Sequence, residues 1–335
     1  MRLALAKPRV AVVGAGIAGL ACARELLARG AWVTVFEQGR TAGGRAGTQA
    51  ADAGAFDHGA QYFTVSNHRF EAIAQRWVDR RFVRRWRGRI IAFSNNECID
   101  KVSPTERFVG VPGMSAIARC LTEEIEIRLN TRVHRMQRHG GIWLLHDDQG
   151  RELSVSGFDI VCLAMPSPQA VQLLAGQSTL SDQLARIDWE PCWAVMLALT
   201  RSSGLDFDGA FVNDDPILSW IARDSGKPGR TAVSGIAERW VLHARPKWSR
   251  QYHSMEPSKA ATWLARAFSA RVGRAITPEH LAAHLWRYAT PVNPLPTDCL
   301  WDEGTKVGVA GDWCIGARVE GAYLSGHSLA EAIAA

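Results

Sequence analysis

The sequence predicts an α/β protein in which a parallel sheet is interrupted by an inserted antiparallel sheet, and three observations indicate it. First, the β-branched run at 9–13 leads through a glycine-rich turn into a helix-forming stretch that ends near Arg29, the order typical of a parallel sheet. Second, the continuous apolar run at 158–166 ends in a proline and predicts a buried parallel strand. Third, the tryptophan-rich region 184–290 contains strand-like runs, such as 194–200, that favour an antiparallel sheet.

The turn after the first strand predicts a Rossmann-like dinucleotide site. It carries glycine at the three positions where such a turn bends, approaches a pyrophosphate and packs a helix closely on a strand: Gly14, Gly16 and Gly19. Ile17 and Ala18 open the helix, whose first N–H groups and positive dipole end would face the phosphates. Glu37 closes the second strand and can accept both ribose hydroxyls. This motif predicts an adenine dinucleotide and leaves NAD and FAD both open.

Composition predicts a folded globular chain and excludes several other classes. The 335 residues are 47% hydrophobic and 21% charged, which supports a full core and argues against disorder. The seven cysteines form neither a CxxC nor a Cys/His cluster, so we expect no disulfide framework and no metal site. Because the apolar N-terminal run is too short for a secretory signal and no window suits a membrane span, we expect a cytoplasmic protein without membrane attachment.

The net charge of +6 suits anionic ligands but identifies none. Its densest cluster is the arginine-rich segment 80–89, where Phe82 and Trp86 are interleaved with the arginines. Such a pattern can bind nucleic acid, but this one is short and isolated. We therefore interpret it as the solvated side of a strand that follows a helix at 68–78, and we expect no nucleic-acid partner.

A second glycine cluster makes the dinucleotide prediction more specific. After Glu37 come Gln38 and then Gly43, Gly44 and Arg45, where glycine lets the chain lie against a cofactor and arginine can reach a pyrophosphate. This arrangement resembles the flavin-containing amine oxidase superfamily, which holds FAD. The next glycine-centred segment contains Gly59, Ala60, Gln61 and Tyr62. A similar segment passes the flavin in that superfamily, and the sequence here most resembles that of the renalase family of microbial type.

The same resemblance implies further FAD contacts at the C-terminal end. Val133, on a strand expected at 131–136, would lie beside the adenine. Gly311 and Asp312 would meet ribityl or ribose hydroxyls, and the last helix would stabilise negative charge at flavin N1 and O2 through its N-terminal dipole. That helix begins with Val319, Glu320, Gly321 and Ala322. No cysteine stands in the family's attachment context, so FAD is expected to be non-covalent.

The predicted FAD-binding domain is discontinuous and the substrate domain is inserted into it. The first comprises residues 1–67, 115–183 and 291–335, and the second comprises 68–114 and 184–290.

Three residues resemble positions that line the renalase pocket over the flavin, which makes them candidate catalytic residues: Tyr62, His243 and Trp286. A lone histidine in an apolar run is more often a hydrogen-bonded core residue, and most tryptophans are core residues, so these assignments compete with a structural interpretation.

The resemblance implies oxidation of 2- and 6-dihydro isomers of NAD(P)H to NAD(P)+, with hydride transfer to flavin N5 and oxygen reduced to hydrogen peroxide. The partners would be this small molecule and O2, with no proton transfer assigned to His243; the oligomeric state stays open. The alternative is oxidation of a primary or secondary amine, which commonly uses a lysine on a strand. Lys227, Lys247 and Lys259 do not lie on a convincing strand. A third possibility is a protein that carries FAD only as a structural or sensing group.

Overall fold

The computed structural model describes residues 7–95, 97–101 and 105–335; the short apolar run predicted at the N-terminus lies largely outside them, at 1–6. The chain forms two compact units. Unit 1 comprises Met1–Gly44, Ile117–Asp188 and Pro291–Ala335, and unit 2 comprises Arg45–Ala116 and Trp189–Thr290. The helices η1 (Gly44–Ala46) and α3 (Ser115–Leu121) lie across the boundaries in the sequence. Residues 45–67, which we expected in the FAD-binding domain, group with unit 2.

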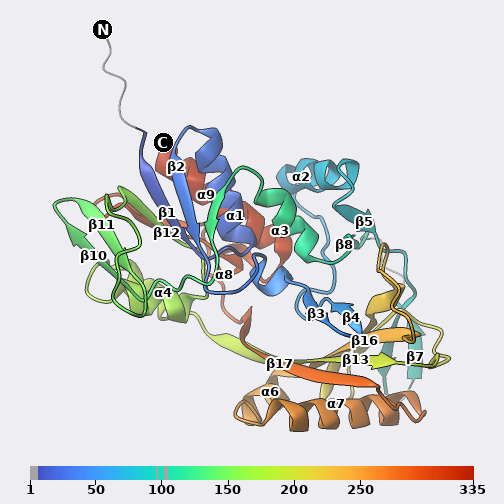
Figure 1. Cartoon of the computed structure of the whole chain (residues 1–335). Coiled ribbons are helices and arrows are strands. Elements are labelled where there is room, and N and C mark those ends of the chain that lie inside the picture. The colour runs from blue at the N-terminus through green and yellow to red at the C-terminus, as the bar shows by residue number, and fades with distance from the viewer. Residues whose placement is uncertain (1–6, 96, 102–104) are drawn as a thin grey trace. The chain divides into compact units, whose positions relative to one another are not determined.

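Unit 1 is built on a mainly parallel sheet, which confirms the predicted α/β fold (Figure 1). Its six strands follow the order β18 (Leu300–Asp302), β19 (Val307–Val309), β12 (Ile160–Leu163), β1 (Arg9–Val13), β2 (Trp32–Phe36) and β9 (Glu126–Arg128). Among the described strands of this sheet, only β18 runs antiparallel to its neighbour. The core strands β1 and β12 are almost entirely buried, as their uninterrupted apolar sequences predict.

Two helices of unit 1, α1 (Ile17–Ala28) and α9 (Val319–Ala334), pack closely together. A methyl group at Gly326 of α9 would lie 1.9 Å from the carbonyl oxygen of Ala18 in α1, so glycine is required for this approach. The shorter helices of the unit are α4 (Ser167–Leu174), α5 (Leu180–Leu184) and α8 (Asp312–Ile315).

The strand predicted at 131–136 is wrong. Residues 131–134 form no strand, and the chain returns to the sheet earlier, through β9. A separate hairpin follows, formed by β10 (Arg135–His139) and β11 (Ile142–His146) around Gly140 and Gly141. Both glycines have positive φ angles, as the tight turn of a hairpin requires.

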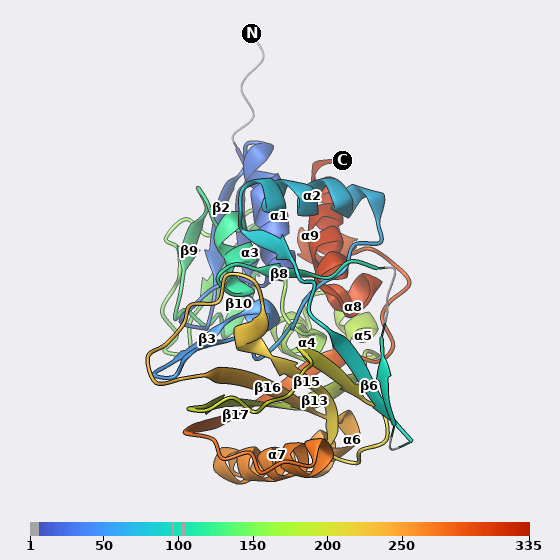
Figure 2. The ribbon, with the colours of Figure 1, turned by 90° about the vertical axis from the view of Figure 1, so that its right-hand side faces the viewer.

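Unit 2 is built on a seven-stranded mixed sheet (Figures 1 and 2). The order is β17 (His280–Pro291), β13 (Trp189–Leu199), β16 (Glu238–Ala244), β15 (Leu218–Arg223), β14 (Gly209–Val212), β6 (Ile90–Ser94) and β7 (Glu97–Asp100). The only parallel pair in this described sheet is β14 with β6, where two segments far apart in sequence meet. Unit 2 also contains α2 (His68–Asp79), α6 (Pro246–Gln251), α7 (Pro257–Val272) and η2 (Asp224–Gly226), and the short pairs β3 (Gln49–Ala51) with β4 (Gly54–Phe56) and β5 (Val83–Arg85) with β8 (Phe108–Gly110).

The two faces of this sheet have different roles because successive side chains of a strand alternate between them. Helix α7 covers one face in Figure 1, where Trp240 and Leu242 of β16 share a core with Leu264 and Phe268 of the helix. On the opposite face Val241 packs with Met196, Ala198 and Phe56. His243 lies two residues after Val241 on β16, so its side chain is on the same face as that of Val241. Its cross-strand partner is Trp220 of β15. We name this second face the open face.

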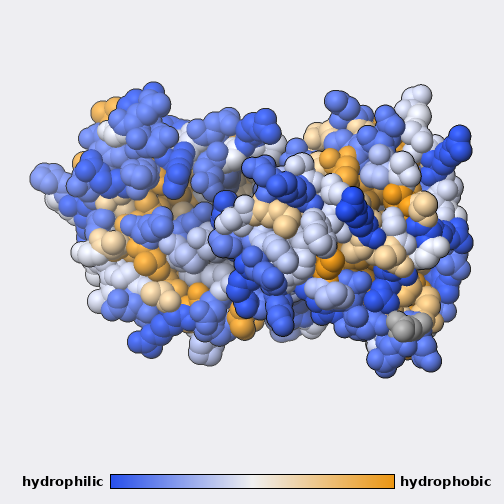
Figure 3. All heavy atoms as spheres, turned by 90° about the horizontal axis from the view of Figure 1, so that it is seen from below, coloured by the Kyte–Doolittle hydropathy of each residue, from blue (hydrophilic) through white to orange (hydrophobic). Residues whose placement is uncertain are grey.

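The described part of the molecule carries no large apolar patch on the face in Figure 3. The side of the molecule in Figure 3 is mainly hydrophilic, with its hydrophobic residues in small separate groups. Within the described residues, none of the helices has the length and hydrophobicity that a membrane crossing requires. All seven cysteines lie within the described residues and are free.

Candidate active site

In unit 1 the glycine turn has the geometry that a bound pyrophosphate requires. Gly14 has a φ of +107°, and a methyl group there would lie 2.6 Å from the carbonyl oxygen of Ala164. A methyl group at Gly19 would lie 2.0 Å from the carbonyl oxygen of Gly14. At Gly16, by contrast, nothing lies within 4 Å of such a methyl group, so the backbone here borders open space. The three glycines therefore turn, expose and pack the chain, in that order.

The N-terminus of α1 provides the donors for this open space. Gly16 is the N-cap residue and makes no side-chain capping bond, so the first N–H groups, from Ile17 and Ala18, are available to an anion. Gly44 has a φ of +54°, and a methyl group there would lie 3.4 Å from Gly16 Cα. The second glycine cluster therefore lies against the first. Gln38 is exposed. These features fit the pyrophosphate of a dinucleotide.

Glu37 is held by the backbone around it. Its Oε2 accepts from the Ala15 N–H at 2.8 Å and its Oε1 accepts from the Gly39 N–H at 2.6 Å. A carboxylate has about four acceptor sites, so lone pairs remain for ribose hydroxyls. Thr131 N–H donates to the Glu37 carbonyl at 2.8 Å, which brings the segment leading to the buried Val133 beside Glu37.

The C-terminal residues of unit 1 form a second helix N-terminus. Gly311 N–H donates to Ser325 Oγ at 2.9 Å, and Asp312 beside it is buried. Helix α9 begins at Val319 without a side-chain capping bond, and its buried Glu320 lies 3.8 Å from the Arg318 guanidinium. A methyl group at Gly321 would lie 2.4 Å from the carbonyl oxygen of Gly316, so the turn and the helix start are pressed together, followed by the half-buried Ala322.

In unit 2 the predicted cofactor-binding segments lie side by side. The Arg45 carbonyl accepts from Ala60 N–H at 2.9 Å, and a methyl group at Gly59 would lie 2.0 Å from that carbonyl oxygen. The Arg45 guanidinium donates to the Ala289 carbonyl at 3.1 Å and lies 5.1 Å above the Trp189 ring. Strands β13 and β17 therefore hold this arginine in place.

Gln61 belongs to a buried polar cluster that sequence reasoning missed. Its Nε2 donates to the carbonyls of Asp57 and Gly59, and its Oε1 accepts from Lys227 Nζ at 3.2 Å. Lys227 also donates to Asp224 Oδ1 at 2.8 Å and lies 3.6 Å from Asp57 Oδ2. The side chains of Lys227, Asp57 and Asp224 have no exposed area, so this lysine is committed to its partners.

Both carboxylates of this cluster are ion-paired, and Asp224 Oδ2, which makes no hydrogen bond among the described residues, lies 3.4 Å from Arg230 Nε. Asp57 accepts from Thr48 Oγ1 at 2.7 Å, from Met114 N–H at 2.8 Å and from the Arg230 guanidinium. Burial, and then the charge of Asp224, raise the pKa of Asp57 above its ordinary value. Burial also acts to raise the pKa of Asp224, but Lys227 and Arg230 outweigh it, so that pKa is lowered. We name Asp57, Asp224, Lys227 and Arg230 the buried charge cluster.

Two of the predicted pocket residues meet on one carbonyl. His243 Nε2 and Trp286 Nε1 each lie 3.1 Å from the carbonyl oxygen of His58. The His58 ring lies 5.1 Å from His284 and 4.8 Å from Trp286, centroid to centroid. Trp286 lies in the middle of β17. We name His58, His243, His284 and Trp286 the imidazole group.

The histidines of the imidazole group are neutral at pH 7. Burial, followed by the neighbouring His284 and His243, lowers the pKa of His58 to about 3. Burial lowers the pKa of His243 to about 4, with the hydrogen bond to the His58 carbonyl acting against it and Lys227 acting with it. Burial and Arg287 also lower the pKa of His284.

Tyr62, the third predicted pocket residue, lies in a different group. Its ring centroid is 6.0 Å from Trp86 and 5.7 Å from Trp220, and the Arg107 guanidinium lies 5.4 Å above the ring. Because Trp220 pairs with His243 across β15 and β16, the open face runs from the Tyr62 group to the imidazole group. The sequence offered one signal for the missed residues, since His58 stands inside the glycine-centred segment 56–63.

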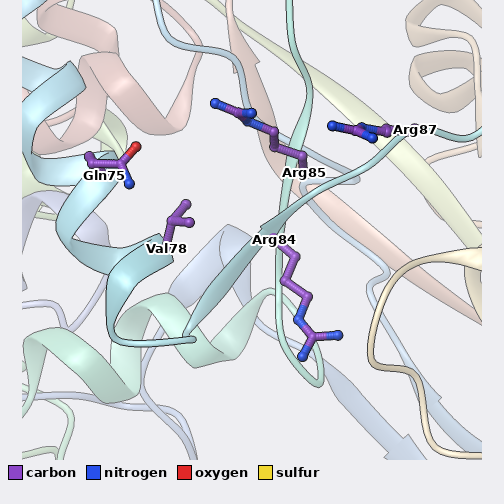
Figure 4. A pocket seen from close by; sticks show the side chains of 5 residues that line it. All are labelled: Gln75, Val78, Arg84, Arg85 and Arg87. Atoms are coloured by element: carbon purple, nitrogen blue, oxygen red, sulfur yellow. The ribbon is translucent and has the colours of Figure 1, made fainter.

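The arginine-rich segment forms a shallow hollow of about 500 Å³ at α2 and β5, lined by Gln75, Val78, Arg84, Arg85 and Arg87. Figure 4 shows that the three guanidinium groups point in different directions, as successive strand residues do, rather than toward one ligand position. Trp86 between them is buried and Arg85 pairs with Glu106 at 3.1 Å, which supports the interpretation as a solvated surface.

Together, the glycine turn, the acid after the second strand and the two uncapped helix N-termini define a dinucleotide-binding oxidoreductase fold. The chain belongs to the flavin-containing amine oxidoreductase family, whose profile matches residues 84–334, and an NAD(P)-binding Rossmann-like domain profile matches residues 12–77. It is an FAD-dependent oxidoreductase, and FAD is its cofactor.

Solved structures share this fold at low sequence identity. A putative protoporphyrinogen oxidase from Exiguobacterium sp. 255-15 is similar with a TM-score of 0.77 and 15% identity, covering 98% of this chain and 99% of that one. Cyclohexylamine oxidase from Brevibacterium oxydans IH-35A has a TM-score of 0.71 and 14% identity over 98% and 99% of the two chains. Reduced UDP-galactopyranose mutase has a TM-score of 0.75 and 9% identity over 98% and 96%.

Proposed function

We propose that this enzyme, a cytoplasmic member of the renalase group, oxidises the 2- and 6-dihydro isomers of NAD(P)H to NAD(P)+. The observation that carries the proposal is the chemistry of the imidazole group, which combines three neutral histidines with the Trp286 ring. Such a surface suits a planar, uncharged dihydropyridine ring, which can stack on aromatic faces and needs no counter-ion.

The buried charge cluster supports the same choice. An ammonium substrate would gain from an unpaired carboxylate, but Asp57 and Asp224 are both paired with Lys227 and Arg230. Lys227 is likewise held by three acceptors and follows η2 rather than lying on a strand. It is therefore poorly suited to the role that a strand lysine has in amine oxidases.

In unit 1, the uncapped N-termini of α1 and α9 are proposed to bind the anionic parts of FAD, and Glu37 is proposed to bind its ribose. FAD held there would supply the electron acceptor for the substrate's hydride, with oxygen as the final oxidant and hydrogen peroxide as its product. Oxidation of a dihydropyridine to a pyridinium releases a hydride and no proton, so no base is required. The residues of unit 2 orient the substrate ring and exclude water from it.

Oxidation of an amine is the second candidate, because the family description and the names of similar structures refer to amines. The rings around Tyr62 could hold a cation over their faces. Anaerobic addition of 2- or 6-dihydro-NAD is expected to bleach the flavin absorption, whereas cyclohexylamine and benzylamine leave it unchanged. Bleaching by an amine alone would establish the second candidate and reject the first. Bleaching by none of them would favour a sensing role.

A further inference from the structure

His243 has one ring nitrogen whose protonation the structure determines. Its Nε2 lies 3.1 Å from the His58 carbonyl oxygen, which also accepts from Trp286 Nε1. A carbonyl oxygen only accepts hydrogen bonds, so Nε2 must carry the proton. The burial of His243 and the nearby Lys227 cation keep its pKa at about 4, so near neutral pH the imidazole carries no second proton. Nδ1 therefore presents a lone pair.

This lone pair is accessible. His243 is partly exposed, and no hydrogen bond from the described residues reaches its Nδ1. Several neighbouring polar atoms are instead fully enclosed and unpartnered, among them His58 Nδ1, Trp220 Nε1 and Arg107 Nε. Of the polar atoms around the imidazole group, His243 Nδ1 is thus an acceptor with a fixed direction that a ligand can reach.

We propose that His243 Nδ1 accepts a hydrogen bond from the carboxamide N–H of the substrate, and so selects a primary carboxamide over a carboxylate. The inference rests on the proposed function, because it concerns a dihydronicotinamide ring at this group. A carboxylate at the same position would direct its own lone pairs at that of Nδ1, and each unsatisfied buried polar group costs about 1–3 kcal/mol. Arg107 above Tyr62 would exert the opposite preference, since a guanidinium attracts a carboxylate.

The experiment titrates the oxidised holoenzyme with NAD+ and with nicotinic acid adenine dinucleotide. These two dinucleotides differ only in that the first has a carboxamide where the second has a carboxylate. Binding is followed by the change in the visible flavin spectrum. We expect NAD+ to bind about tenfold more tightly to the wild-type enzyme. His243→Gln keeps a donor for the His58 carbonyl and removes Nδ1, so the two ligands should then bind about equally. His253→Gln is the matched control, which changes an exposed histidine outside the imidazole group and should keep the tenfold preference.

The outcomes separate this inference from the function on which it rests. Equal or tighter binding of the carboxylate ligand to the wild type would overturn the inference while leaving the proposed function intact. So would a tenfold preference that persists in His243→Gln. If neither dinucleotide perturbs the flavin, the proposed function fails and the inference fails with it. The wild-type ratio decides the matter even if His243→Gln loses FAD, and His243→Asn, whose amide oxygen can replace Nδ1, should then retain the preference.

Discussion

The candidate site in unit 1 and the candidate site in unit 2 are built in different ways. In unit 1 the contacts come from the backbone, through the turn at Gly14–Gly19 and the uncapped starts of α1 and α9. In unit 2 they come from side chains carried by separate segments, such as His58, Lys227 and Trp286. A backbone site depends on space that only glycine leaves open. A side-chain site depends on charge and proton balance among residues that are distant in sequence.

The largest effect is expected where unit 1 has no space. Gly19→Ala would put a methyl group 2.0 Å from the Gly14 carbonyl oxygen, so the turn must open and both the fold of the turn and FAD binding should be lost. The purified variant should lack flavin absorbance and have a lower melting temperature than the wild-type apoprotein.

Gly16→Ala is the matched control for that variant. Because nothing lies within 4 Å of its added methyl group, the apoprotein should melt within about 2 °C of the wild type. FAD binding should still weaken strongly, since the methyl group enters the space where the pyrophosphate approaches. Normal FAD affinity in Gly16→Ala would show that the cofactor does not use this turn.

The charge balance of unit 2 gives the next largest effect. Lys227→Met leaves two fully buried carboxylates with Arg230 as their nearest remaining cation, and breaking such a buried arrangement costs about 3–5 kcal/mol of unfolding free energy. Lys259→Met, at an exposed position on α7, should change it by less than about 0.5 kcal/mol. Urea denaturation of both variants measures the difference. A similar cost for both would mean that the cluster contributes no more than a surface charge.

A smaller effect is expected at Glu37, where unit 1 uses a side chain. Glu37→Gln replaces one of the two carboxylate oxygens that hold the Ala15 and Gly39 N–H groups with an amide donor. The loss of one charge-assisted hydrogen bond should weaken FAD binding by about 1–3 kcal/mol, roughly 5- to 150-fold in Kd. Calorimetric titration of the apoprotein with FAD measures this, and an unchanged Kd would remove Glu37 from the cofactor site.

The sequence was sufficient for the glycine turn of unit 1 because the determinants of that turn are local. The run 9–19 contains the strand, the turn and the helix start, and each glycine has its own steric requirement. The error at 131–136 arose where the apolar pattern was weak, and Val133 lies in a segment without regular secondary structure.

The sequence was insufficient for unit 2 because its determinants are not local. Nothing near Lys227 in sequence indicates that Gln61 and Asp57 will be its partners, 166 residues or more away. Likewise, His243 and Trp286 could be named separately, but their common partner is a backbone carbonyl, that of His58, which no side-chain pattern reveals. The fold brings these segments together, and local sequence motifs do not indicate which distant segments will meet.

The smallest effect concerns the proton balance of the imidazole group. In the unfolded chain histidine takes up a proton near pH 6.5, whereas in the folded protein His58 does so only near pH 3 and His243 near pH 4. Between pH 6.5 and 4 the unfolded state therefore binds more protons, so stability falls as the pH falls, by up to about 1.4 kcal/mol per pH unit for each histidine. His58→Phe keeps an aromatic ring beside Trp286 and removes one titrating group, so its stability should fall less steeply by about that amount. Urea denaturation of the holoenzymes at pH 5.0, 5.5 and 6.5 measures both slopes. Parallel slopes would mean that His58 takes up its proton near pH 6.5 in the folded protein as well, and the surface proposed to receive the substrate ring would then gain a positive charge as the pH falls below 6.5.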